Sequence, residues 1–168
     1  RSRGENVPGG LWEAGTNPTD AGRVIDGDNT TFWQASPDDP LGDWFVQIDL
    51  GRAVLAEEIR LHFPDQEGAR PFRQFTVFTA TGITSDALDD LFIFSPVYLT
   101  TQPNTDTVVS FPLAFDIQDS AQVVDTGLDI DQADIDKFRL IQYINFTIEE
   151  VDLEGALAEI EVITAGDN

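Results

Sequence analysis

Residues 23–33 read RVIDGDNTTFW, and the rest of the chain can be interpreted outward from this stretch. Its centre, residues 26–31, groups Asp, Asn and Thr oxygens around Gly27. Glycine takes the tight or positive-φ geometry that a chain needs to wrap a small cation. Two apolar residues precede the loop and two aromatic residues follow it, so we expect a core to anchor both of its ends. Hard oxygen ligands favour calcium, and the alternative is an ordinary solvated turn of Asp, Gly and Asn.

Four further segments follow this stretch along the chain. They read WFVQIDLG at 44–51, AEEIRLHF at 56–63, FTVFTATG at 75–82 and ALAEIEVI at 156–163. Together with IDGDNTTFW at 25–33, they resemble the discoidin family, also called the coagulation-factor 5/8 C-type family. Bacterial members of that family include the family 32 carbohydrate-binding modules. The resemblance implies an all-β fold, an antiparallel jelly-roll β-sandwich of the galactose-binding-domain type with loops clustered at its ends.

The resemblance also implies a structural calcium ion. Carried over by position, its ligands are the carbonyl of Arg23, the carboxylate of Asp26, the carbonyl of Asp28, the hydroxyl and carbonyl of Thr31, and Ala158 with Glu159 from the last strand. Such an ion would join a loop near the start of the chain to the final strand. It would thereby close a long segment whose ordering otherwise costs entropy.

The spacing of apolar residues independently predicts strands. Alternating or β-branched runs occupy residues 44–50, 56–63, 75–80, 91–99, 107–115, 138–148 and 156–163, with about eight strands in all. We expect the first strand to end at Gly51, loops at 34–43 and 64–73, and essentially no helix. The aspartates between residues 116 and 136 form either a second calcium site or a solvated acidic loop.

Composition predicts one domain. The 168 residues are 41% hydrophobic and no linker-like segment divides them, so we expect a single sandwich over residues 1–168 with an irregular lead-in at 1–22. The chain has no methionine and begins Arg-Ser-Arg, from which we expect a mature or excised segment of a longer polypeptide. The resemblance to the discoidin family implies that this polypeptide is secreted. It also contains no cysteine, which excludes disulfide bonds and thiol catalysis.

The charge is strongly acidic, with nine Lys plus Arg against 31 Asp plus Glu and a net charge of -22. Such a field repels phosphate backbones and anionic lipids, so nucleic acid and anionic membranes are not expected partners. We interpret the acidity as adaptation to salt or calcium-rich surroundings, and the alternative is that it only keeps the fold soluble.

Catalytic patterns are missing from the sequence. His62 is the only histidine, no G-x-S-x-G serine accompanies it, and no His-rich zinc cluster exists. Carboxylates are so abundant that a pair of them carries no information about glycoside hydrolysis. We therefore predict a protein that is not an enzyme.

Sugar recognition is the function that the resemblance implies. In family 32 modules the ligand lies among loops at one end of the sandwich, where a histidine after the TFW motif and an arginine late in the following strand often hold it. Gln34-Ala35-Ser36 and Phe63-Pro64 stand at these places, which weighs against galactose-type recognition. Polar groups that can hold a hydroxyl-rich ligand, and one ring that can stack on it, are Gln34, His62, Asp65, Arg70, Arg73 and Phe63. The alternative is that these side chains are surface residues and local ion pairs.

Two functions from different classes follow. The first is a non-catalytic, calcium-stabilised carbohydrate-binding or adhesion module of a secreted or cell-surface protein, with a glycan or polysaccharide as partner. The second is a structural β-sandwich that packs against neighbouring protein subunits in an extracellular assembly without binding sugar.

Overall fold

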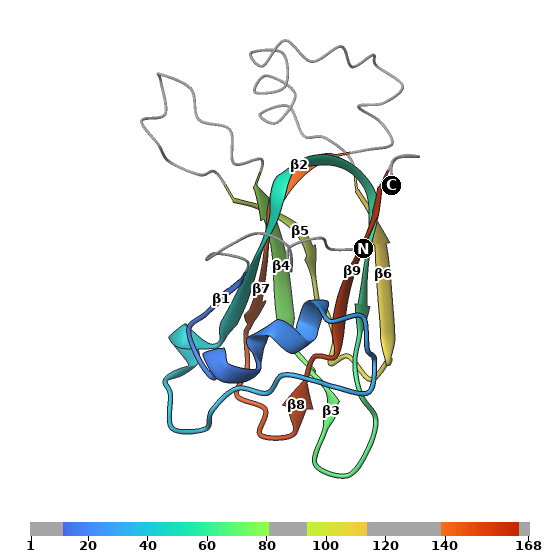
Figure 1. Ribbon diagram of the computed structural model, residues 1–168. Coiled ribbons are helices and arrows are strands. Elements are labelled where there is room, and N and C mark those ends of the chain that lie inside the picture. Colours follow the sequence, from blue (N-terminus) through green and yellow to red (C-terminus); the bar gives the residue numbers. More distant parts are fainter. Residues whose placement is uncertain (1–11, 81–93, 114–138, 165–168) are drawn as a thin grey trace.

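The computed structural model describes residues 12–80, 94–113 and 139–164 (Figure 1). The acidic segment at 116–136, with its predicted second calcium site, lies outside these residues. So do the first part of the strand predicted at 91–99 and the end of the strand predicted at 107–115.

The described residues are mostly strands in antiparallel pairs, which confirms the prediction of an all-β sandwich. The strands are β1 (Trp12–Ala14), β2 (Phe45–His62), β3 (Arg70–Pro71), β4 (Phe75–Ala80), β5 (Ser95–Leu99), β6 (Val108–Pro112), β7 (Arg139–Ile148), β8 (Gly155–Ala156) and β9 (Glu159–Thr164). Two 3-10 helices, η2 (Pro18–Ile25) and η3 (Leu41–Asp43), complete the elements. Neither helix in the described part of the chain is long and apolar enough to cross a membrane.

The longest strand, β2, belongs to both layers of the sandwich. Its first part pairs with β1 and β7, and its last part pairs with β6 and β9, while β4 and β5 extend the layer beyond β7. Figure 1 shows β2 curving over the top of the molecule between these two sets of partners. One strand therefore carries the chain from one layer into the other.

The prediction that the strand ends at Gly51 is wrong. Gly51 has φ of 83°, and the pairing with β7 shifts register between Asp49 and Val54. A positive φ at an irregularity of this kind bends a strand and increases its twist without ending it. The turn residue in the sequence thus marks a bend inside one strand instead of a boundary between two.

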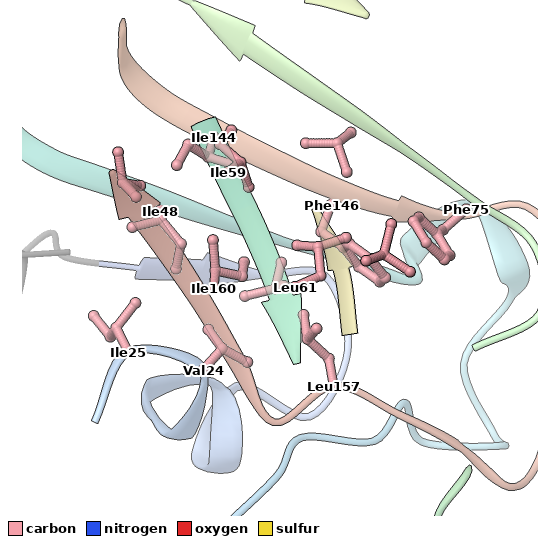
Figure 2. Close-up of a cluster of buried hydrophobic side chains, with 14 of the residues drawn as sticks. Val24, Ile25, Ile48, Ile59, Leu61, Phe75, Ile144, Phe146, Leu157 and Ile160 are labelled. Atoms are coloured by element: carbon pink, nitrogen blue, oxygen red, sulfur yellow. The ribbon is translucent and has the colours of Figure 1, made fainter. Parts of the chain in front are cut away.

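The core lies between the two layers. Alternate residues are buried at both ends of β2 and in β7 from Ile144 to Ile148, as the period of two predicts. Figure 2 shows side chains from both layers meeting, and the following are at most 1% exposed: Ile48, Ile59, Leu61, Ile144, Phe146, Leu157 and Ile160.

Helix η2 replaces part of the lead-in that was predicted to be irregular. Pro18 stands at its first turn, where a missing backbone N–H costs nothing, and its apolar residues Ala21, Val24 and Ile25 are buried. Figure 2 shows Val24 and Ile25 packing toward the core beside β9. Because Asp26 caps the end of η2, the helix holds the start of the 26–31 loop against the sandwich.

Two loops meet at the lower end of the molecule in Figure 1, where β3 pairs in parallel with β8. We call this the loop end and define it by residues 64–74 and 149–155. The Arg70 N–H donates to the Glu154 carbonyl at 2.8 Å. A Cβ on Gly155 would lie 2.2 Å from Cδ1 of the Phe72 ring, so glycine permits this close approach.

Candidate functional site

The loop at 26–31 brings together three of the predicted calcium ligands. The Thr31 hydroxyl donates to Asp26 Oδ2 at 2.5 Å and lies 3.1 Å from the Asp28 carbonyl. The Asp28 N–H donates to Asp26 Oδ1 at 2.9 Å. Hydrogen bonds from the Thr30 hydroxyl and N–H lower the pKa of the Asp28 carboxyl. The loop is therefore ordered by its own polar groups, with its oxygens turned toward one another.

The fourth, Glu159, reaches this loop from β9. Its carboxylate accepts the Gly27 N–H at 2.8 Å and 3.3 Å through its two oxygens, although 132 positions separate these residues. Glu159 is only 4% exposed. Burying a carboxylate is costly unless it is paired or hydrogen-bonded. The hydrogen bond from the Gly27 N–H offsets part of this cost and holds the Glu159 side chain at the loop.

The remaining predicted ligands, Arg23 and Ala158, adjoin this arrangement. The Arg23 side chain contacts the Phe32 carbonyl at 3.4 Å and Asp20 at 3.3 Å, and so braces the loop. The Ala158 N–H donates to the His62 carbonyl at 2.8 Å. The Ala158 hydrogen bond holds the backbone from which one carbonyl ligand is expected, whereas the Arg23 contacts are made by its side chain.

The donor chemistry fits a hard cation. The predicted set contains two carboxylates, a hydroxyl and carbonyls, all of them oxygens of the kind that calcium prefers. Among residues 12–80, 94–113 and 139–164, no three His, Asp or Glu side chains gather as a metal cluster. A site in this loop would thus depend on backbone oxygens as much as on carboxylates.

A small polar pocket of about 210 Å³ adjoins the loop, and Gly27, Asn29, His62, Glu159 and Glu161 line it. His62 Nε2 lies 3.1 Å from Glu161 Oε1, and this hydrogen bond lowers the pKa of the Glu161 carboxyl. His62 therefore lies beside the predicted cation loop, whereas Arg70 and Arg73 line a different pocket.

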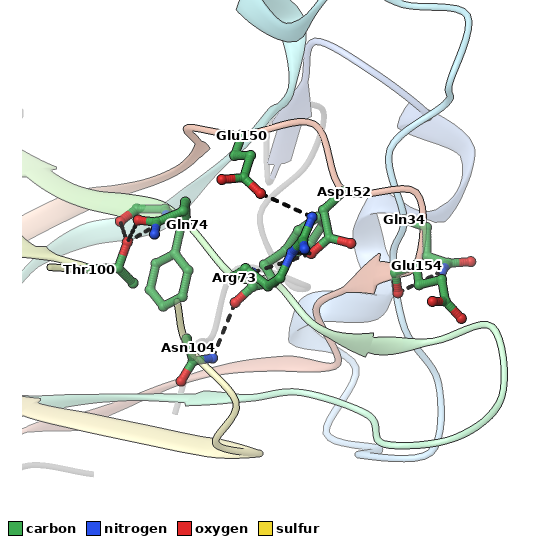
Figure 3. A network of polar contacts seen from close by, with 10 residues as sticks. Gln34, Arg73, Gln74, Thr100, Asn104, Glu150, Asp152 and Glu154 are labelled. Carbon is green, nitrogen blue, oxygen red and sulfur yellow. Dashed lines mark hydrogen bonds and ion pairs between the residues drawn. The ribbon is translucent and has the colours of Figure 1, made fainter. Parts of the chain in front are cut away.

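That second pocket lies at the loop end and has a volume of about 280 Å³. Its lining residues are Arg70, Pro71, Arg73, Asp152, Leu153 and Glu154. Arg70 contacts Asp65 at 2.6 Å, so two of the predicted ligand-binding residues form one ion pair. Arg73 contacts Glu150 at 3.0 Å and Asp152 at 3.4 Å, as Figure 3 shows.

Gln34 joins the loop end from a distant part of the chain. Its Nε2 donates to the Gly68 carbonyl at 2.8 Å and lies 3.4 Å from the Glu154 carbonyl (Figure 3). The structure thus brings Gln34, Asp65, Arg70 and Arg73 to one end of the sandwich.

The Phe63 side chain is buried and is not available to a ligand at the loop end. It is 5% exposed, and its ring packs at centroid distances of 5.5 Å from Phe75 and 6.3 Å from Phe146. Its ring belongs to the core and offers no stacking face to a ligand. The expectation that Phe63 supplies that face is corrected by its burial under two other aromatic rings.

Comparison with solved structures identifies the architecture. A family 32 module of NanJ from Clostridium perfringens, in complex with galactose, aligns with a TM-score of 0.61 at 15% identity over 90% of each chain. Chitosan-binding module 2 from the chitosanase/glucanase of Paenibacillus sp. IK-5, in complex with chitotriose, aligns with 0.56 at 14% identity over 90% of this chain and 92% of that one. The family 32 module of AlyQ, in complex with 4,5-unsaturated mannuronic acid, aligns with 0.54 at 14% identity over 92% and 94%.

The chain has the discoidin-like fold of family 32 carbohydrate-binding modules. This confirms the architecture that the sequence motifs implied, and the low identities extend the likeness no further than the fold. No protein-family model matches the sequence, and no curated protein sequence matches it.

One feature of this discoidin-like fold escaped the sequence interpretation. Leu153, in a loop interpreted only as acidic, is 69% exposed and lines the loop-end pocket. Val151, two residues earlier, is 50% exposed. The signal was present as two apolar residues alternating with acids between residues 149 and 154, a pattern that a purely solvated loop does not need.

Proposed function

We propose that the chain is a non-catalytic carbohydrate-binding module of a secreted or cell-surface protein, and that it binds glycan in the loop-end pocket. Three structural neighbours with the same fold are carbohydrate-binding modules in complex with galactose, chitotriose and 4,5-unsaturated mannuronic acid. Their ligands support a sugar as the partner of this fold. The residues of this chain supply the rest of the argument.

The observation that carries the proposal is an exposed leucine among polar groups. Leu153 lines a pocket whose other side chains include two arginines and two acids. Sugars have apolar C–H faces and rims of hydroxyl groups, so a ligand can rest on Leu153 while Glu154 accepts hydrogen bonds from its hydroxyls and the half-exposed Arg73 donates to them. Leu153 takes the place that the sequence analysis gave to Phe63.

The same proposal includes a structural calcium ion. Its ligands would be Asp26, Asp28, Thr31 and Glu159, with backbone carbonyls of Arg23 and Ala158. The hydrogen bonds that already join the 26–31 loop to Glu159 support this assignment. The ion would fasten the loop after η2 to the start of β9 and would take no part in sugar contact.

Calorimetric titration with galactose, chitotriose and mannuronate oligomers tests the proposal. Leu153→Ala should weaken binding about fivefold, because losing about 40 Å² of apolar contact at about 25 cal/mol per Å² costs about 1 kcal/mol. Leu99→Ala is the matched control, since Leu99 is 55% exposed but does not line this pocket. Equal affinities of both variants, or no binding of any sugar by the wild type, would refute the proposal.

The structural alternative, packing against neighbouring subunits without sugar binding, stays a prediction. It is tested on the same material by sedimentation with and without calcium. Ordered oligomers in calcium together with no glycan binding would establish it in place of the sugar-binding function.

A further inference from the structure

The charges around the loop-end pocket are unequal. Arg70 and Arg73 line it, and four carboxylates surround them: Asp65, Glu150, Asp152 and Glu154. The local excess of two negative charges lies within a chain of net charge -22. The pocket therefore presents a negative potential despite its two arginines.

The arginines are already engaged by carboxylates of the protein. The Arg73 guanidinium contacts Glu150 at 3.0 Å and Asp152 at 3.4 Å. The backbone N–H of Arg73 also donates to Asp152 at 3.3 Å. The Asp152 side chain is only 10% exposed. A ligand carboxylate that captured Arg73 would leave Asp152 largely buried without its cation, which is costly.

The ion pair between Arg70 and Asp65 is weaker, but it also disfavours a ligand that carries a carboxylate. Arg70 and Asp65 are 52% and 56% exposed, so their ion pair at 2.6 Å contributes little stability. A ligand carboxylate could displace Asp65 at small cost, but the Asp65 charge would remain beside it. Repulsion would then offset part of the new contact.

Glu154 is the group that is open to a ligand. Its backbone is fixed, because its carbonyl accepts from the Arg70 N–H at 2.8 Å and lies 3.4 Å from Gln34 Nε2. Its carboxylate makes no hydrogen bond or ion pair with any residue in the described ranges, and Figure 3 shows it beside Gln34. Glu154 thus has a fixed backbone and an unengaged carboxylate, and it lines the same pocket as the exposed Leu153.

We propose that this pocket selects glycans that carry protonated amino groups, and that Glu154 is the residue that determines this specificity. The inference rests on the proposed function, because it names the chemical class of sugar for the same pocket. The apolar face of the sugar lies on Leu153, and its ammonium group pairs with Glu154. Neutral glycans bind more weakly, and uronate oligomers bind most weakly of all.

Three trimers of similar size test the inference by calorimetry with the whole chain at mildly acid pH. They are the glucosamine trimer, the glucose trimer of the same linkage, and a mannuronate trimer. We expect the glucosamine trimer to bind about threefold to tenfold more tightly than the glucose trimer. Its advantage should shrink as salt is raised, since the Debye length falls to about 8 Å at physiological ionic strength.

Glu154→Gln is the deciding variant, and Glu57→Gln is its control. Both changes remove one charge from an exposed glutamate, but Glu57 lies on β2 and does not line the pocket. Glu154→Gln should reduce the preference for the glucosamine trimer roughly twofold to fivefold, the range that exposed ion pairs give, while Glu57→Gln leaves it unchanged.

Two results overturn this inference alone: the glucose or mannuronate trimer binds as tightly as the glucosamine trimer, or the two variants behave alike. Failure of all three trimers to bind overturns the proposed function as well. Circular dichroism of each variant establishes that a loss of binding is not a loss of fold.

Discussion

If the proposed calcium ion is bound, replacing Glu159 with glutamine should remove most of the stability that the ion supplies. Glutamine keeps the shape of the side chain and one oxygen that can accept the Gly27 N–H, which now lies 2.8 Å from the carboxylate. It removes one of the two carboxylates, Asp26 and Glu159, in the predicted ligand set. The substitution therefore tests the ion with little disturbance of packing.

The magnitude follows from linkage. Calcium at about 100 times its dissociation constant stabilises the native state by about 2.7 kcal/mol. Removal of even an outer-shell partner weakens metal affinity about 10–100-fold, and we take about 100-fold for the loss of a charged ligand. The same calcium concentration then stabilises the variant by only about 0.4 kcal/mol. The difference of about 2.3 kcal/mol corresponds to a Tm that is about 5–9 °C lower for a chain of this size.

Thermal melting followed by circular dichroism, in calcium and after chelation, measures this difference. In chelator we expect the variant to be about as stable as the wild type or more stable, because a buried amide costs less than a buried carboxylate. Glu161→Gln is the control, since Glu161 lies two residues along the same strand and contacts His62. It should keep the full response to calcium.

Two results would refute this reasoning. One is a wild-type Tm that does not change on chelation, and the other is a Glu159→Gln variant that responds to calcium as strongly as the wild type. Either would mean that the contact between Glu159 and Gly27 is a hydrogen bond that requires no ion.

Two further predictions concern stability. Gly155→Ala should destabilise the fold by about 1–3 kcal/mol in urea unfolding, because its Cβ would lie 2.2 Å from the buried Phe72 ring. Gly42→Ala, where a Cβ meets nothing within 4 Å, should change stability far less, and equal effects would contradict the clash. The pKa of Glu161 is lowered from 4.5 by its hydrogen bond to His62, so this pair stabilises the fold above pH 4.5 and loses its effect as pH falls through the folded-state pKa. In chelator, His62→Ala should remove about 0.5 kcal/mol above pH 4.5 and less below it, and a loss independent of pH would contradict this assignment.

Strand positions were predictable from the sequence because alternation is a local property. In the first part of β2, Val46, Ile48 and Leu50 are buried while the residues between them are half-buried, as a period of two requires. The order of the discoidin-like motifs predicted the architecture as well, although two of them, at 44–51 and 56–63, belong to the single strand β2. The oxygen-rich composition of the 26–31 loop was likewise visible in the letters alone.

Local signals failed where a residue type permits more than one backbone outcome. Gly51 resembled a strand end, but with φ of 83° it bends β2 and the strand continues to His62. The residues from Pro18 to Ile25 had the composition of a loop, yet burial of Ala21, Val24 and Ile25 stabilises a 3-10 helix there. In both places contacts with other strands decided between conformations that the local sequence allows.

By itself, the sequence determined the strands, the acidic charge and the oxygen donors of one loop, because these depend on residue type and near neighbours. Only the tertiary structure decided which of these groups meet. It joins Gly27 to Glu159 across 132 positions, buries Phe63 and leaves Leu153 exposed beside Arg73. Strand register and the covering of each side chain by distant segments determine such contacts, and neither is a property of a single stretch of sequence.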